Sequence, residues 1–195
     1  MKRIIDIFAS AFMLILLFPF GLVIALLIAS DSRGGVFYRQ SRVGRYNRDF
    51  TLYKFRTMRT DADRLGLLTV GARDPRVTRV GYYLRKYKID ELPQLLNILS
   101  GDMSFVGPRP EVRKYVDLYN NEQKKVLSVR PGLTDYASIA YINENEILEK
   151  ANDKEQTYIN EIMPEKIKLN MKFIQNPSLY QYFKIIFLTI KSIFI

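Results

Sequence analysis

The longest apolar stretch of the chain lies near its N-terminus and covers residues 4–29. Four residues interrupt it: Asp6, Ser10, Pro19 and Gly21. A helix of this length can cross the apolar core of a bilayer. A removable signal peptide fits less well, because the run is long and no small-residue cleavage site follows it. The pattern therefore predicts a membrane helix as an anchor (1–30) and a folded domain beyond it (31–195).

The flanks of this helix and its proline decide whether it crosses the membrane or turns back. Lys2 and Arg3 precede the run, and five arginines follow it between positions 33 and 48. Basic flanks tend to stay on the cytoplasmic side, so both ends are drawn to the same face. Pro19 would kink the helix, and Asp6 suits a helix lying at the interface, paired with Arg3. A re-entrant helix and a proline-kinked span both remain open.

Beyond the anchor, the hydrophobic pattern becomes that of short strands separated by turns. Glycines punctuate residues 34–44, which predicts a turn, a short strand and another turn. A second strand is predicted over Phe50–Met58, where a period of two would place Lys54 and Arg56 on one face as a cationic pair. A solvated edge strand that uses lysine against aggregation would show the same pattern.

The other patterns are helical. Residues 77–88 are basic and rich in tyrosine, and residues 144–172 are charged with a helical period. Residues 177–195 combine aromatic and aliphatic positions with two lysines, which favours an interfacial helix over a core helix that closes the domain. Together the patterns predict an α+β fold, mostly helical, with short strands in a small globular domain and interfacial amphipathic helices.

Composition narrows the chemistry that this domain can perform. The chain has 195 residues, and its 30 Lys and Arg exceed its 20 Asp and Glu, which implies an anionic partner: nucleic acid, acidic lipid or a phosphorylated substrate. It has no cysteine and no histidine, which excludes disulfides, thiolate metal sites and the commonest general base. Acid, base or nucleophilic work must fall on Asp, Glu, Lys, Ser, Thr or Tyr.

Two adjacent carboxylates, Asp90 and Glu91, open an apolar run that reads as a helix. One explanation is capping, because Asp is favoured as an N-cap, Glu in the first turn, and Pro93 is tolerated there. The other explanation is functional. Free N–H groups at a helix start attract phosphate, and two carboxylates would repel it unless a divalent cation such as Mg²⁺ bridges them. The sequence alone leaves both explanations open.

Two arginines braced by prolines follow this pair. Arg109 stands between Pro108 and Pro110, which restrict the backbone on either side of it. Arg130 begins a similar turn. A guanidinium held in this way can make a bidentate contact with a phosphate or a nucleotide.

In this order, the motifs resemble the bacterial sugar transferase family, the monotopic phosphoglycosyl transferases that begin lipid-linked glycan assembly. The matching segments are Val36–Gln40, Arg42–Gly44, Tyr53–Met58, Asp74–Thr78, Asp90–Gln94, Gly101–Pro110 and Arg130–Thr134. With the anchor and the C-terminal helix, the resemblance covers nearly the whole chain. It implies a re-entrant membrane helix broken near Pro19 and a catalytic domain at the cytoplasmic face of the bacterial inner membrane.

The resemblance also implies a reaction. A UDP-sugar would give its sugar-1-phosphate to a polyprenyl (undecaprenyl) phosphate and release UMP, in the first membrane step of glycoconjugate or polysaccharide biosynthesis. Asp90 would attack the phosphate attached to the sugar and form a covalent aspartyl intermediate, and Glu91 would hold Mg²⁺. A carboxylate is ionised at neutral pH and needs no histidine base to act as a nucleophile. The substrate-binding candidates are Lys54, Arg56, Pro108, Arg109, Pro110 and Arg130.

The partners expected from the resemblance are the UDP-sugar, polyprenyl phosphate and membrane lipid, without nucleic acid; a homodimer is also considered. The chain departs from the family pattern round the pocket, at Gly34–Gly35, Lys88–Ile89 and Asp135–Ala137, and also at Asn170. Asp135 stands where many members have Gly, and Asn170 stands where many have Asp. A second acidic group of the site is therefore in question, with Asp135 as a candidate replacement, and sugar specificity does not carry over.

Two rival functions are set against this one. A membrane-tethered basic scaffold would bind anionic lipid or nucleic acid without catalysis, and it would tolerate Asp90→Asn because Asn is also a good cap. A direct glycosyl transferase would leave a monophosphate-linked sugar on the lipid and release UDP. The nucleotide that is released therefore distinguishes the candidates.

Overall fold

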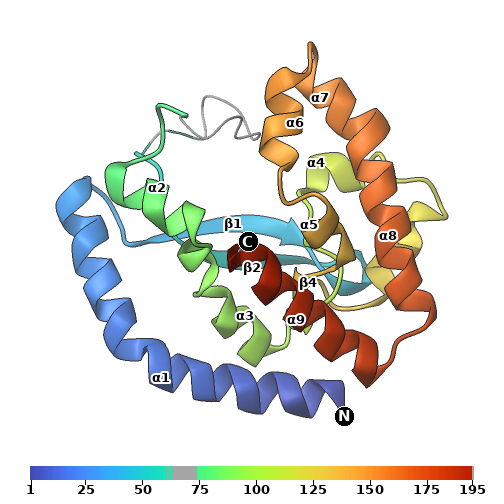
Figure 1. The fold of residues 1–195 in the computed structure, drawn as a ribbon, viewed down its shortest axis with the longest axis horizontal. Helices are drawn as coiled ribbons and strands as arrows, with labels where there is room; N and C mark the ends of the chain where they lie inside the picture. Colours follow the sequence, from blue (N-terminus) through green and yellow to red (C-terminus); the bar gives the residue numbers. More distant parts are fainter. Residues whose placement is uncertain (61, 63–73, 195) are drawn as a thin grey trace.

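The computed structural model describes residues 1–60, 62 and 74–194, and Figure 1 shows helices arranged round two small sheets. Strands β1 (Phe37–Val43) and β2 (Asp49–Phe55) form an antiparallel hairpin, and β3 (Ser104–Val106) pairs in parallel with β4 (Gly132–Thr134). The mostly helical α+β class predicted from the sequence is confirmed. The helices are α1 (Lys2–Asp31), α2 (Arg79–Lys86), α3 (Gln94–Ser100), α4 (Arg113–Val116), α5 (Tyr136–Ala140), α6 (Glu144–Lys150), α7 (Lys154–Thr157), α8 (Met163–Gln175) and α9 (Leu179–Phe194).

Helix α1 is continuous and contains Pro19. Figure 1 shows it bent near its middle, so that its two halves run along two sides of the domain. A proline inside a helix removes one backbone hydrogen bond and produces such a bend. In the described part of the chain, α1 is the one helix long and apolar enough to cross a membrane, and most of its apolar side chains face outward. The helix is bent at its proline without losing helical structure, and its re-entry into the membrane stays a prediction.

Polar side chains fasten the N-terminal half of α1 to the domain. The buried Asp6 carboxylate accepts hydrogen bonds from Ser104 Oγ (3.1 Å), the Phe105 backbone N–H (3.2 Å) and the Tyr182 hydroxyl (2.7 Å). Arg3 instead donates to the carbonyl of Leu99 (2.9 Å), where cations stabilise the end of a helix. The expected pairing of Asp6 with Arg3 is therefore wrong, because both side chains bond to groups of the domain instead.

The second strand is shorter than the sequence predicts. It ends at Phe55, and Met58 forms only an isolated bridge with Val77. Arg56 lies just past the strand and donates to the carbonyls of Ser32 (2.8 Å) and Arg33, where the chain leaves α1. The expected cationic pair of Arg56 with Lys54 on one strand face is not formed, because the guanidinium is used to hold this turn.

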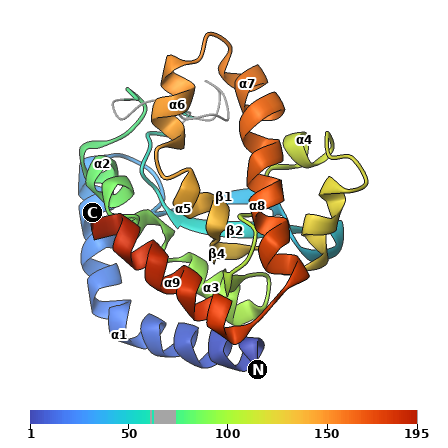
Figure 2. The ribbon, with the colours of Figure 1, turned by 45° about the vertical axis from the view of Figure 1, so that its right-hand side comes forward.

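Helix α9 buries one face and exposes another. Tyr182 and Ile185 are fully buried against Val106 and Phe173, whereas Phe183 and Phe187 are exposed. Figures 1 and 2 both place α9 close to α3 and the N-terminal half of α1. The helix therefore closes the domain, as the core alternative predicts. Contact of its exposed apolar face with a membrane stays a prediction, and the last position of the expected helix, 195, lies outside the described residues.

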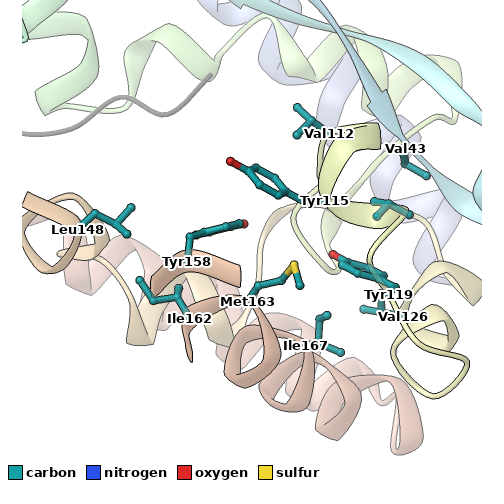
Figure 3. Close-up of a cluster of buried hydrophobic side chains, with 11 residues drawn as sticks. Val43, Val112, Tyr115, Tyr119, Val126, Leu148, Tyr158, Ile162, Met163 and Ile167 are labelled. Atoms are coloured by element: carbon teal, nitrogen blue, oxygen red, sulfur yellow. The ribbon is translucent and has the colours of Figure 1, made fainter. Parts of the chain in front are cut away.

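The charged region predicted as helical over 144–172 is divided between α6, α7, a π-helical turn at Tyr158–Ile162 and α8. These elements pack with α4 and the end of β1 in the largest apolar cluster, part of which Figure 3 draws. A second cluster joins α3, α1 and β2. The two clusters lie on either side of the loop that follows β3, which positions that loop for the site described next.

Candidate active site

The acidic pair lies in a tight turn between α2 and α3. Lys88 takes a left-handed conformation (φ 57°), which ends α2 and starts the 3-10 turn Ile89–Glu91. Pro93, rather than Asp90, occupies the N-cap position of α3, and no side-chain cap hydrogen bond is made at either turn. The N-cap role expected for Asp90 is therefore wrong, although both acids do lie in the first turn of the 3-10 segment, where Glu91 was expected.

Glu91 forms ion pairs with two cations, Lys54 and Arg109. Its side chain is largely buried and accepts from Lys54 Nζ (2.9 Å), which reaches it from β2. Both carboxylate oxygens also accept from Arg109, one of them at 3.2 Å. Burial alone would raise the pKa of Glu91, but the charges and hydrogen bonds of Arg109 and Lys54 hold that pKa well below its usual range. Glu91 is therefore a permanent anion at neutral pH.

Asp90 is buried beside Glu91 but is not held in the same way. It is 6% exposed, and no hydrogen bond to its carboxylate is made within the described part of the chain. Burial and the neighbouring charge of Glu91 raise the pKa of Asp90, while Lys54 and Arg85 act against that rise. A carboxylate without hydrogen bonds, in a cationic surrounding, keeps its lone pairs available for attack on an electrophile.

The loop that carries Arg109 is braced by close contact between two backbones. The Gly107 N–H donates to the Thr134 carbonyl (3.1 Å), and the Gly132 N–H donates to the Pro108 carbonyl (2.9 Å). A Cβ on Gly132 would come within 2.1 Å of the Gly107 nitrogen, so this approach requires glycine. Arg109 is thus presented by a backbone with little freedom.

Asp135 and Asn170, two of the departures from the family pattern, meet behind this loop. Asp135 Oδ2 accepts from the Arg109 backbone N–H (2.8 Å) and from Asn170 Nδ2 (3.0 Å). Asp135 also caps α5 through the Ser138 N–H. The acidic side chain at 135 therefore stands beside the amide at 170, and its charge raises the pKa of Arg109, although Glu91 contributes more to that rise.

Two of the predicted binding residues are not brought to the acidic pair. The three hydrogen bonds found for Arg56 run to the carbonyls of residues 32–34, as described above. Arg130 Nε donates to the Gly101 carbonyl (2.7 Å), beyond the end of α3. Both guanidiniums hold the backbone in place. Lys54 and Arg109 are brought to Glu91, and Pro108 and Pro110 flank Arg109 as expected.

Sequence reasoning missed Arg85. It lies on α2, its Nε donates to Thr57 Oγ1 (3.0 Å), and burial lowers its pKa while the charge of Asp90 opposes that shift. It is therefore a third cation within electrostatic range of the pair. The basic residues of 77–88 indicated a cationic helix in the sequence, but the helical period did not show which cation would lie near Asp90.

A cavity of about 190 Å³ lies behind Arg109. Its walls include the Pro108–Pro110 loop, Arg42 from β1, and side chains of α4, the π-helical turn and α8. Arg42 donates to the Pro110 carbonyl (3.1 Å), so the loop is held from this side as well. The acidic pair and the cavity are joined by the Arg109 side chain, which lines one and bonds to the other.

The donor set fits a hard divalent cation that also binds substrate phosphates. Among the described residues, no group of three or more acidic, histidine or cysteine side chains could hold a metal unaided. Mg²⁺ needs only one or two carboxylates when phosphate oxygens complete its shell. Glu91 would supply one such carboxylate, with Asp90 beside it, if its ion pairs with Lys54 and Arg109 gave way.

Comparison with known proteins identifies the family. The model of the family described as "bacterial sugar transferase" matches residues 1–195. The chain belongs to the bacterial sugar transferase family. The resemblance inferred from the spaced motifs is thus confirmed.

Relatives within this family are named for transfer to undecaprenyl phosphate. A UDP-N-acetylgalactosamine-undecaprenyl-phosphate N-acetylgalactosaminephosphotransferase of Aeromonas hydrophila is 40% identical over 195 residues, covering 98% of this chain and 43% of that protein. An undecaprenyl-phosphate glucose phosphotransferase of Komagataeibacter xylinus is 38% identical, covering 97% and 35%. A UDP-glucose:undecaprenyl-phosphate glucose-1-phosphate transferase of Caulobacter vibrioides is 37% identical, covering 98% and 69%.

The chain spans less than half the length of the first two of these relatives. Their names specify different sugars, N-acetylgalactosamine and glucose. Membership of the family therefore does not fix the sugar that this chain would transfer.

Proposed function

We propose that this sugar transferase moves a sugar-1-phosphate from a UDP-sugar to polyprenyl (undecaprenyl) phosphate and releases UMP. The observation that carries the proposal is the unequal treatment of the two acids. Glu91 is bound through both oxygens by Lys54 and Arg109, whereas the buried Asp90 accepts no hydrogen bond within the described residues. Glu91 is thus held as an anion by two cations, and Asp90 is left free to react.

In the first step, an Asp90 carboxylate oxygen attacks the phosphorus that carries the sugar. The bond between that phosphorus and the UMP oxygen breaks, and UMP leaves with the electron pair. In the second step, a phosphate oxygen of the polyprenyl acceptor attacks the same phosphorus, and the acyl phosphate bond breaks to regenerate the Asp90 carboxylate. Neither step requires a proton from Asp90, which suits a chain without histidine.

The cations round the pair support both steps by binding charge. Phosphoryl transfer depends mainly on positioning and on stabilising charge at the phosphate oxygens. Arg109 and Lys54 bind Glu91 in this structure, and a donor diphosphate offers them stronger acceptors. Arg85 lies on α2, the helix before the acidic pair, and acts on Asp90 through its charge.

We further propose that Glu91 holds Mg²⁺ when the donor is present, with Asp90 beside it. When bound, this ion would neutralise the charge of the donor phosphates. If Arg109 and Lys54 released Glu91, its carboxylate oxygens would be available as ligands. Both acids are buried, and it is the charges and hydrogen bonds of Arg109 and Lys54, not burial, that keep Glu91 anionic.

Membrane association is part of the same proposal. Helices α1 and α9 lie near each other in the fold (Figure 2), and each exposes apolar side chains. An apolar surface of this extent is best satisfied by lipid, and a polyprenyl phosphate acceptor would reach the domain from there. We place the domain at the cytoplasmic face of the bacterial inner membrane, where UDP-sugars would be available.

UMP release tests the proposal. The full chain in nanodiscs is incubated with polyprenyl phosphate, Mg²⁺ and a panel that includes UDP-N-acetylgalactosamine, UDP-glucose and UDP-galactose. We expect UMP to accumulate with at least one donor, to match the amount of lipid-linked product, and to fall to background when EDTA removes the metal. Release of UDP would instead support a direct glycosyl transferase, and membrane or nucleic-acid binding without nucleotide release would support a scaffold.

A further inference from the structure

The cavity behind Arg109 has walls that the proposed chemistry does not use. It lies between the Pro108–Pro110 loop, α4, the π-helical turn and α8, and its volume is about 190 Å³. Its lining combines charged, polar and aromatic side chains, so a small polar group can be held there.

Glu111 is the central polar group of this cavity. Its Oε1 accepts from the Val112 N–H (2.9 Å) and from Arg42 Nη1 (3.4 Å), and its Oε2 accepts from the Tyr158 hydroxyl. Burial and the charge of Glu111 raise the pKa of Tyr158, so the phenol stays protonated as a donor. These groups form a buried network of one acceptor and several donors within a partly apolar pocket.

Other walls add aromatic faces and a second charge pair. The Tyr115 and Tyr158 rings pack on each other, with 4.9 Å between their centroids, and Met163 and Tyr119 belong to the same group of side chains (Figure 3). Lys166 pairs with Glu144 at 2.7 Å, and their side chains are 16% and 25% exposed, so water reaches this part of the wall. The cavity is therefore accessible and combines flat apolar surfaces with carboxylates and cations.

Glu111 and Glu144 give this wall two carboxylates, which pair with Arg42 and Lys166. A neutral ring with several hydroxyl groups fits these walls, because each hydroxyl can donate to a carboxylate and accept from Arg42, Tyr158 or Lys166. Its apolar face can pack on the tyrosines.

We propose that this cavity binds the sugar ring of the donor and that Glu111 and Tyr158 help to determine which sugar is accepted. The inference rests on the proposed function, in which the sugar is attached to the phosphorus that Asp90 attacks. Arg109 joins the two places, since it reaches Glu91 and also lines the cavity. The sugar enters the cavity while the diphosphate stays at the cations beside Asp90.

Glu111→Gln and Tyr158→Phe test this assignment in the full chain in nanodiscs. For the donor that wild type uses, we expect each variant to raise KM at least about fivefold, because a hydrogen bond to a sugar hydroxyl is lost or weakened. The inhibition constant of UMP, which lacks the sugar, is expected to stay within about twofold of wild type. The ranking of the donor panel is also expected to change. Glu146→Gln, at an exposed acid of α6, is the matched control and should behave as wild type.

UMP release by wild type tests the proposed function on its own. Once wild type releases UMP, the variants test whether the cavity binds the sugar. If KM is unchanged in both folded variants, the cavity does not bind the sugar. If UMP inhibition weakens in step with the donor KM, the cavity binds the nucleoside and the assignment is overturned. Thermal melting identifies a variant that fails to fold; if Glu111→Gln does so, Tyr158→Phe carries the same comparison.

Discussion

Replacing Asp90 with Asn is expected to reduce UMP release on the order of 10³-fold or more while the fold is retained. The substitution removes the nucleophile and keeps the shape of the side chain, and loss of a covalent catalyst typically has effects of this size. Burial and Glu91 raise the pKa of Asp90, so its ionised form is disfavoured in the folded state. Removing that charge should leave the melting temperature equal to or higher than that of wild type at neutral pH.

The measurement is turnover by UMP release, with thermal melting on the same preparations. Asp117→Asn is the matched control, since Asp117 follows α4, its side chain is 62% exposed, and it pairs with Arg113 at 3.7 Å. It should retain wild-type turnover. Full activity of Asp90→Asn would contradict the account and return the acids to a structural role.

Replacing Glu91 with Gln is expected to reduce both turnover and stability. Turnover should fall about 10² to 10³-fold, because the group that organises Lys54 and Arg109 beside the phosphates is lost. The free energy of unfolding should fall by about 3 kcal/mol at neutral pH, because two cations lose their buried partner. Loss of stability thus separates this variant from Asp90→Asn, although the two acids are adjacent.

The stability difference should depend on pH in a defined direction. The folded state holds the pKa of Glu91 well below its ordinary value of 4.5. The stabilisation by Glu91 is therefore present above about pH 4.5 and is lost as pH falls towards the lower folded pKa. Denaturant unfolding of wild type and Glu91→Gln from pH 7 to pH 3 should show the curves converging. A constant difference across this range would mean that the carboxylate charge does not stabilise the fold.

The order of motifs in the sequence predicted the family, which is confirmed, whereas the geometry of the site was predicted only in part. The missing histidine left Asp, Glu, Lys, Ser, Thr or Tyr as candidate reactive groups, and the resemblance alone assigned the nucleophile to Asp90. The capping position of Asp90 could not be excluded from the sequence, because it depends on the left-handed backbone of Lys88. A non-glycine residue in that conformation is set by tertiary packing, which a local pattern does not report.

The cations show the same limit. Lys54 and Arg56 share a strand period in the sequence, yet one reaches Glu91 and the other holds the carbonyls after α1, because β2 ends at Phe55. Arg85 and Glu111 act on the site or its cavity through contacts between segments far apart in the chain. Residues of this kind are found only when the fold brings those segments together.

Intact-mass spectrometry tests the central claim, that Asp90 bonds to phosphorus, most directly. The chain is incubated with an accepted UDP-sugar and Mg²⁺ in the absence of polyprenyl phosphate. We predict a gain in mass equal to one sugar phosphate, a matching burst of UMP, localisation of the adduct to the peptide that contains Asp90, and no adduct on Asp90→Asn. An active preparation with unchanged mass and no acceptor-independent UMP, or with the adduct on another residue, would contradict the account.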